Sequence, residues 1–148
     1  MIVVESVVDI GRPATEVFSF VADQTNAPRW QHGLYEVRRL TDGPIGVGTE
    51  HAFVRRLAGR RIESRNRFIR YEPGRCVEFE IPEGWLTGQA SYLVEPTGTG
   101  RCRLISLMQF HATGPVALAS PLLTRVLARD SRRDEAALRD LLEAQGQP

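Results

Sequence analysis

The order of turn signals and unbroken segments limits the folds open to this chain. From Val47 to His111, turn residues interrupt β-rich segments about every 10–15 residues, a spacing typical of an antiparallel sheet with short connections. From Leu122 to Ala144 no strong helix breaker occurs, and Ala, Leu, Arg and Asp dominate. The sequence therefore predicts a meander of strands followed by one long C-terminal helix.

The N-terminal part predicts a strand, two short helical segments and a second strand. Val3–Ile10 is rich in β-branched residues, and Pro13 suits the first turn of a helix. That helix covers Glu16–Val21, and the breaker-rich segment Asp23–Pro28 ends it but leaves room for one further helical turn. A second strand begins near Val37. The predicted order is strand, two short helices, six strands and a long helix, an α+β organisation.

A first hairpin predicts which side chains share the inner face of the sheet. If Ala58-Gly59 forms a two-residue loop, His51 lies opposite Asn66 and Phe53 lies opposite Ser64. The other face of the same strand pair carries most of the charged residues. That charged face is expected to lie toward solvent.

A second hairpin tests the same assignment. With Pro73-Gly74 as its loop, Phe68 lies opposite Phe79 on the inner face. Both turns place the shared strand with the same face inward, which predicts a sheet with one buried face. The pairs predicted across this hairpin are Asn66–Ile81, Arg67–Glu80, Phe68–Phe79, Ile69–Glu78 and Arg70–Val77.

Alternation along the strands extends this inner face and mixes polar with apolar side chains. A few polar groups in an apolar lining are typical of a ligand pocket, because unpaired buried polar groups cost about 1–3 kcal/mol each. Alternatively, His51 and Asn66 bond one another or a buried water. The predicted inner residues are His51, Phe53, Ile62, Ser64, Asn66, Phe68, Phe79, Ile81, Tyr92, Val94, Cys102, Leu104, Ser106, Met108 and Phe110.

The polar inner residues include one candidate for acid–base chemistry. His51, with Asn66 behind it, could act as a general base, and Tyr92 or Ser106 could polarise a carbonyl. No phosphate-binding glycine loop, metalloprotease motif or hydrolase nucleophile motif occurs in the sequence. The sequence thus offers a candidate catalytic group without an established catalytic motif.

The C-terminal helix presents a stripe that is apolar at both ends and charged in the middle. Either this middle spans a pocket mouth, where Asp130 or Asp134 would contact a polar end of the ligand, or it forms solvated pairs with neighbouring Arg residues. The stripe consists of Leu123, Leu127, Asp130, Asp134, Leu138 and Leu141.

The order of several short motifs resembles the START-like superfamily, in its polyketide cyclase/dehydrase (SRPBCC) branch, over nearly the whole chain. The matching segments are Ile10–Phe18, Asp23, Pro28–Trp30, Val47–Thr49, Tyr71–Arg75 and Leu138–Glu143. The resemblance implies one domain over residues 1–148 with a helix-grip fold, a seven-stranded antiparallel sheet wrapped around the last helix. It also implies lipids, polyketides or other hydrophobic metabolites as ligands, but no universal catalytic motif.

Three hypotheses for function follow. The first is binding of a small hydrophobic molecule between the sheet and the last helix. Trp30 and Trp85 either gate the cavity or anchor the core. The second is a polyketide cyclase, aromatase or dehydratase that uses His51. The third is a protein-interaction module that uses the outer Arg/Glu face or a sheet edge. The predicted ligand-binding residues are Trp30, Phe53, Ser64, Phe68, Phe79, Ile81, Trp85, Tyr92, Ser106, Met108, Phe110, Leu123 and Leu127.

The composition limits which binding partners and which cellular compartment we expect. The net charge of +1 gives no reason to expect a nucleic-acid partner. No signal peptide and no apolar stretch of about 20 residues is present, so the chain is expected to be cytoplasmic without stable membrane insertion. Cys76 and Cys102 are expected to be reduced thiols. His32 is expected to lie in a connection between elements, and His111 on the outer face of the sheet. No metal and no cofactor are expected, and a homodimer is left open.

Overall fold

The computed structural model describes residues 1–57 and 59–146 and follows the predicted order of elements. The N-terminal elements are β1 (Ile2–Ile10), α1 (Ala14–Ala22), the 3-10 helix η1 (Gln24–Arg29) and β2 (Leu34–Arg39). The meander consists of β3 (Glu50–Leu57), β4 (Arg60–Glu72), β5 (Cys76–Ile81), β6 (Leu86–Gly98) and β7 (Arg101–Ala112). The 3-10 helix η2 (Gly114–Ala119), which the sequence did not predict, leads into α2 (Ser120–Gln145).

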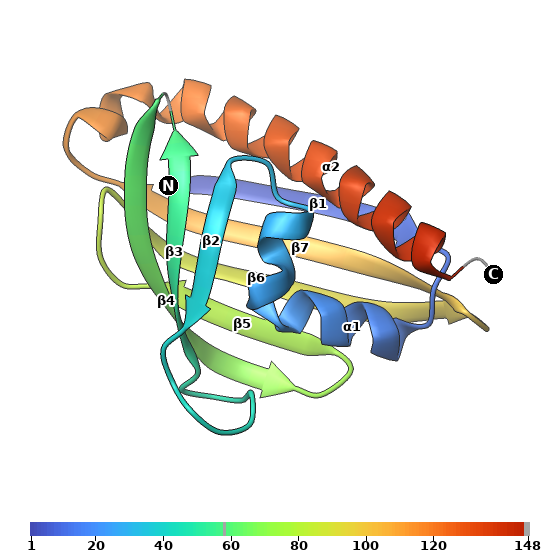
Figure 1. The fold of residues 1–148 in the computed structure, drawn as a ribbon. Coiled ribbons are helices and arrows are strands. Elements are labelled where there is room, and N and C mark those ends of the chain that lie inside the picture. Colours follow the sequence, from blue (N-terminus) through green and yellow to red (C-terminus); the bar gives the residue numbers. More distant parts are fainter. Residues whose placement is uncertain (58, 147–148) are drawn as a thin grey trace.

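The seven strands form one antiparallel sheet in the order β1-β7-β6-β5-β4-β3-β2. The sheet curves around α2, which runs along one edge of the concave side and packs mainly against the edge strand β1 (Figure 1). Helix α1 packs against β6 and β7, and η1 packs against β2. This arrangement confirms the helix-grip fold, in which one long helix lies along one edge of the concave face and shorter helices cover another part of it.

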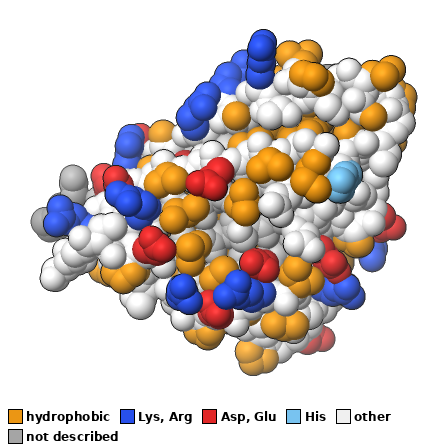
Figure 2. Space-filling model, turned by 180° about the vertical axis from the view of Figure 1, so that it is seen from behind, with side chains coloured by type: hydrophobic (Ala, Val, Ile, Leu, Met, Phe, Trp, Pro, Cys, Tyr) orange, Lys and Arg blue, Asp and Glu red, His pale blue; other side chains and the backbone are white. Residues whose placement is uncertain are grey.

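The outer, convex face of the sheet carries charged side chains that pair across strands. The pairs include Arg67 with Glu80 on β4 and β5, and Arg103 with Asp9 at 2.9 Å on β7 and β1. Seen from behind, Arg and acidic side chains lie among apolar ones on this side of the molecule (Figure 2). Because these pairs are largely exposed, each is expected to contribute at most about 1 kcal/mol.

The register between β3 and β4 confirms the first predicted hairpin. His51 pairs with Asn66, and Phe53 pairs with Ser64. His51, Phe53 and Asn66 are buried, whereas Arg65 and Arg67, the residues on either side of Asn66 in β4, are exposed. Of the predicted loop residues, Ala58 lies outside the described residues.

The register between β4 and β5 is only partly as predicted. Phe68 pairs with Phe79 and Arg67 with Glu80, but a bulge between Phe68 and Arg70 moves Arg70 opposite Glu78 and Tyr71 opposite Val77. The predicted pairs Arg70–Val77 and Ile69–Glu78 are therefore wrong. The turn is longer than expected: Glu72 pairs with Cys76, so three residues rather than two form the loop. The bulge absorbs the extra residue and turns the Tyr71 side chain inward, where its ring lies 5.6 Å from that of Phe18.

The predicted limits of the helices and strands differ from the structure by a few residues. Strand β2 begins at Leu34, three residues before the predicted start, and its pairing with β3 is irregular between Leu34 and Glu36. Helix α2 begins two residues before the predicted Leu122.

Over the parts of the chain that the structure describes, no helix is long and apolar enough to cross a membrane.

Candidate functional site

The concave face has two ends that differ in how tightly it is packed. At the end that carries α1 and the last turns of α2, which we call the closed end, the inner side chains are almost fully buried. They include Phe18, Val77, Leu104, Leu138 and Leu142. At the end that carries η2 and the first turns of α2, which we call the open end, many inner side chains are only half-buried. They include Ile81, Leu86, Met108, Leu123 and Leu127.

His51 is fully buried, yet neither of its ring nitrogens has a hydrogen-bond partner within the described residues. Burial lowers the pKa of His51 below its usual 6.5, and the Asn66 amide opposes this shift to a smaller extent. The imidazole is therefore neutral at pH 7, with one N–H group and one lone pair free. This matches the protonation state of a general base or of a hydrogen-bonding ligand contact.

Asn66 is also buried, but its partner is a residue that the sequence did not indicate. Its amide Nδ2 donates to Oε1 of Gln24 at 2.6 Å, and Gln24 lies at the start of η1 and is itself buried. The Asn66 Oδ1 atom has no partner among the described residues. The His51–Asn66 pair therefore keeps unused hydrogen-bonding groups on an otherwise aromatic surface.

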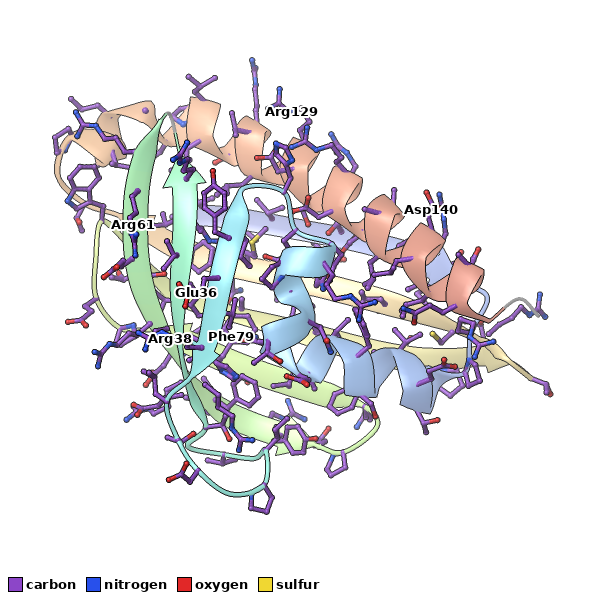
Figure 3. The ribbon with its side chains drawn as sticks, viewed as in Figure 1. Glu36, Arg38, Arg61, Phe79, Arg129 and Asp140 are labelled. Atoms are coloured by element: carbon purple, nitrogen blue, oxygen red, sulfur yellow. The ribbon has the colours of Figure 1, made fainter. Side chains whose placement is uncertain are left out.

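Aromatic rings connect His51 to the centre of the sheet. The rings of His51 and Phe68 lie 5.3 Å apart, those of Phe68 and Phe79 6.2 Å, and those of Phe79 and Tyr92 5.9 Å. Trp30, at the end of η1, makes an edge contact with Tyr92 at 6.1 Å. In Figure 3 Phe79 lies on the inner side of the sheet, whereas Arg129 and Asp140 project from the surface of α2 away from it.

The remaining predicted ligand-binding residues fall into buried and accessible groups. Phe53 and Phe110 are buried, and so is Ser106, whose Oγ atom has no partner within the described residues. Trp85 lies in the β5–β6 connection with 56% of its surface exposed, and its carbonyl accepts a hydrogen bond from the backbone of Thr113. The half-buried members are Ser64, Ile81, Tyr92, Met108, Leu123 and Leu127.

Polar residues gather beside Tyr92 where β3 and the η1–β2 connection approach α2. The Gln31 side chain donates to the Tyr92 hydroxyl at 3.3 Å and accepts from Arg55 at 3.4 Å. Burial raises the pKa of Tyr92 to about 12, so the phenol stays protonated and can donate a hydrogen bond. Arg55 was not among the predicted site residues.

The charged side chains in the middle of α2 face two different directions. Asp130 pairs with Arg133 at 3.5 Å on the helix surface, as expected for a solvated turn. Asp134 is half-buried and accepts a hydrogen bond from the backbone N–H of His32 at 3.0 Å, which ties α2 to the η1–β2 connection.

Glu135, which lay outside the predicted stripe, is the acidic residue of α2 that is most deeply buried, with 3% of its surface exposed. Its neighbours on the helix at helical spacing are the buried Leu138 and Leu142. Leu141, which the predicted stripe contained, is only half-buried. The inward face of α2 is therefore rotated from the predicted one toward Glu135 and Leu142.

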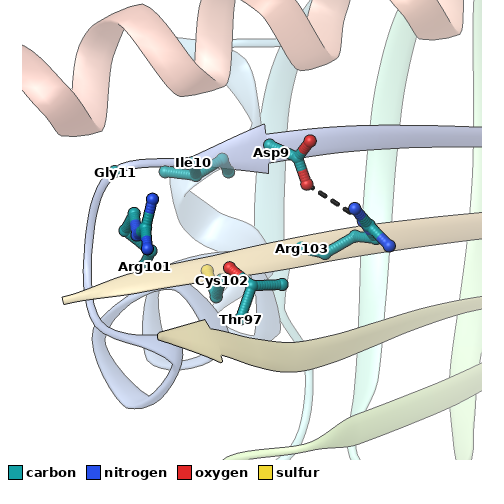
Figure 4. A pocket seen from close by; sticks show the side chains of 7 residues that line it. All are labelled: Asp9, Ile10, Gly11, Thr97, Arg101, Cys102 and Arg103. Carbon is teal, nitrogen blue, oxygen red and sulfur yellow. Dashed lines mark hydrogen bonds and ion pairs between the residues drawn. The ribbon is translucent and has the colours of Figure 1, made fainter. Parts of the chain in front are cut away.

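Among the surface hollows formed by the described residues, two lie near the closed end. One, of about 320 Å³, lies between the end of β1 and the β6–β7 hairpin, where Arg101 and the Asp9–Arg103 ion pair line it (Figure 4). The other, of about 350 Å³, lies between the start of α1 and the β4–β5 turn. Neither hollow is lined by a residue predicted for the site.

The cysteines and acidic residues do not form a metal centre in the part of the chain that the structure describes. No group of three or more His, Cys, Asp or Glu side chains is close enough there to hold a metal ion. Cys76 and Cys102 are buried and unpaired. Burial raises the pKa of Cys102 to about 11, which keeps this thiol protonated and unreactive.

Comparison with known proteins places this geometry in a family. Residues 1–143 match the family model described as polyketide cyclase/dehydrase and lipid transport. Comparison with curated proteins finds no match.

Several solved structures share the fold at low sequence identity. A protein from Thermus thermophilus is 15% identical with a TM-score of 0.83, and the match covers 98% of this chain and 99% of that one. The Zhui aromatase/cyclase from a Streptomyces strain is 19% identical with a TM-score of 0.80, covering 98% and 95%. The di-domain aromatase/cyclase BexL of the BE-7585A biosynthetic pathway is 21% identical with a TM-score of 0.79, covering 100% of this chain and 48% of that one.

Proposed function

Because the chain belongs to the polyketide cyclase/dehydrase and lipid transport family, we propose that it binds a small, largely apolar molecule between the sheet and α2. The observation that carries this proposal is the set of inward polar atoms without partners among the described residues, which lie among aromatic and aliphatic side chains. These atoms are His51 Nδ1 and Nε2, Asn66 Oδ1 and Ser106 Oγ.

Such a combination is costly for folding alone. Each buried polar group that finds no partner destabilises the folded state by about 1–3 kcal/mol. A bound molecule with matching polar groups would satisfy them, and the half-buried apolar side chains of the open end would supply contact area. Met108 and Leu127 contribute such surface from the sheet and from α2.

Dye binding tests this proposal with two neighbouring residues on β7. Met108 faces the concave side and Leu107 faces the convex side, and both are half-buried. We expect Nile red to bind the wild-type protein, and Met108→Trp to weaken binding roughly tenfold or more by filling the site. Leu107→Trp should leave dye affinity unchanged. Thermal denaturation verifies that both variants fold, and equal affinity of all three proteins would contradict the proposal.

A second candidate function is cyclisation or dehydration of a polyketide by acid–base chemistry. The free nitrogens and the lowered pKa of His51 favour this candidate, because a neutral imidazole can accept a substrate proton. The structurally similar Zhui and BexL are described as aromatase/cyclases.

Turnover and binding of a linear poly-β-ketone distinguish the two functions. In an enzyme, His51→Gln should abolish the cyclised product while affinity for the substrate changes less than about tenfold. In a binding protein, neither the wild type nor His51→Gln forms product above the uncatalysed rate.

A further inference from the structure

Glu135 is a buried carboxylate that no cation neutralises within residues 1–57 and 59–146. Burial raises its pKa, and the charged group that acts on it is another acid, Asp134. A buried carboxylate without a cation is costly for folding, and well-packed apolar residues would be more stable at such a position. Stability therefore does not explain why an acid occupies position 135.

The hydroxyl groups around Glu135 leave hydrogen-bonding capacity unused. Ser6 Oγ donates to Glu135 Oε1 at 2.8 Å, so Ser6 must accept its other hydrogen bond from Ser131 Oγ, also at 2.8 Å. Ser106 lies directly opposite Ser6 across β1 and β7 and is 6% exposed. Its Oγ atom lies near the carboxylate and opposes the pKa shift, but it makes no hydrogen bond of normal geometry to any described residue.

This cluster lies where the half-buried apolar surface of the open end begins. Tyr92 faces Ser106 from β6, and Met108 follows two residues after Ser106 on the same face of β7. Leu127 lies eight residues before Glu135, or about 12 Å along α2, and is half-buried. A molecule that contacts Met108 and Leu127 would therefore have the acid and the free serine within its length.

We propose that Glu135 and Ser106 form a polar subsite that binds a hydroxyl group of an apolar ligand. The ligand hydroxyl donates a hydrogen bond to the Glu135 carboxylate and accepts a hydrogen bond from Ser106 Oγ. An ammonium group would satisfy the carboxylate only, because it has no lone pair for the serine proton. The inference rests on the proposed function and specifies the chemical class of its ligand: an alcohol or phenol with an extended apolar body.

A matched set of small aromatic compounds tests this subsite by titration calorimetry. Naphthol, methoxynaphthalene and naphthylmethylamine share one apolar body and differ in their polar group. We expect the wild-type protein to bind naphthol about tenfold or more tightly than methoxynaphthalene, because a hydrogen bond to a charged acceptor is worth that factor. Glu135→Gln should reduce this preference to about threefold or less, and Ser106→Ala should reduce it in the same direction.

Glu143→Gln is the control, because it makes the same change farther along α2, where Glu143 accepts a hydrogen bond from the backbone of Gly11. It should keep the full preference for naphthol. The subsite is refuted if Glu135→Gln keeps the preference, or if the wild type binds naphthylmethylamine more tightly than naphthol. If Nile red and all three compounds fail to bind, the proposed function itself is wrong. If all bind without preference, only the subsite is wrong.

Discussion

The two ends of the concave face use the same sheet and the same helix for different purposes. At the closed end α2 contributes Leu138 and Leu142, which are buried among strand residues such as Val77 and Leu104. At the open end α2 contributes Leu123 and Leu127, which are only half-buried. A single amphipathic helix can therefore support the fold with its last turns and leave apolar surface available with its first turns.

Hydrogen bonding differs between the ends as well. The side chains named for the closed end, such as Phe18, Val77 and Leu138, are aliphatic or aromatic, so their burial stabilises the fold without needing hydrogen-bond partners. The unpaired atoms of His51 and Ser106 belong to other positions on the concave face: the His51 ring lies beside Phe68, and Ser106 lies opposite Tyr92. The concave face thus combines apolar residues that stabilise the fold with a few buried polar groups that do not, a combination often seen where function costs stability.

The largest effect is expected from shortening α2 side chains at the two ends. Leu138→Ala should lower the free energy of unfolding by about 3–4 kcal/mol, because it leaves a cavity in a fully packed region. Leu127→Ala should cost about 1 kcal/mol or less, because its side chain is already in contact with solvent. Urea denaturation of the two variants measures both values.

The comparison between the ends depends on the ratio of these two losses. Similar losses would mean that α2 is packed equally along its length, and the open end would then not be a separate region. An equal dependence of the free energy of unfolding on urea concentration would show that both variants unfold in the same transition as the wild type.

The sequence was sufficient to predict the sheet and much of its inner face. Period-two alternation and the turn positions assigned His51, Phe68 and Ser106 correctly to the concave side, because a slip of one residue would have reversed every side chain. The bulge at Ile69 was not predictable from alternation. It depends on a three-residue turn after Glu72, and the motif Pro73-Gly74 suits a two-residue or a three-residue turn.

The polar contacts of the site were harder to predict than its strands. Glu135 lies in a segment of alternating charges, and such segments usually face solvent, so helical spacing alone favoured Asp134. Gln24 lies in a short 3-10 helix without apolar periodicity, and its hydrogen bond to Asn66 joins residues 42 positions apart. Only the packing of η1 and α2 onto the sheet brings these groups to the concave face.

A smaller effect, of opposite sign, is expected at His51. His51→Leu should stabilise the protein at pH 7 by about 1 kcal/mol, because it removes two unpaired buried nitrogens from an aromatic environment. The folded-state pKa lies below the usual 6.5, so the unfolded chain takes up a proton more readily, and wild-type stability falls as the pH drops through 6.5. The stability gain of the variant should therefore increase below pH 6.5.

Thermal denaturation between pH 5 and pH 8 measures this difference. A loss of stability on His51→Leu at pH 7 would show that the imidazole is satisfied in the folded protein. His51 would then belong with the structural residues of the closed end.

The smallest effect is expected at Glu135, where Ser6 already supports the charge. The folded-state pKa is raised above the usual 4.5, so the folded protein retains a proton that the unfolded chain releases, and wild-type stability falls as the pH rises through this window. Glu135→Gln cannot ionise, so the two proteins should be nearly equal in stability below pH 4.5. The variant should become the more stable one as the pH increases toward 7, by less than His51→Leu gains. Denaturant midpoints over this range measure the difference. A variant that is less stable at pH 7 would mean that the carboxylate holds α2 onto β1, and the boundary between the two ends would then be structural rather than a binding surface.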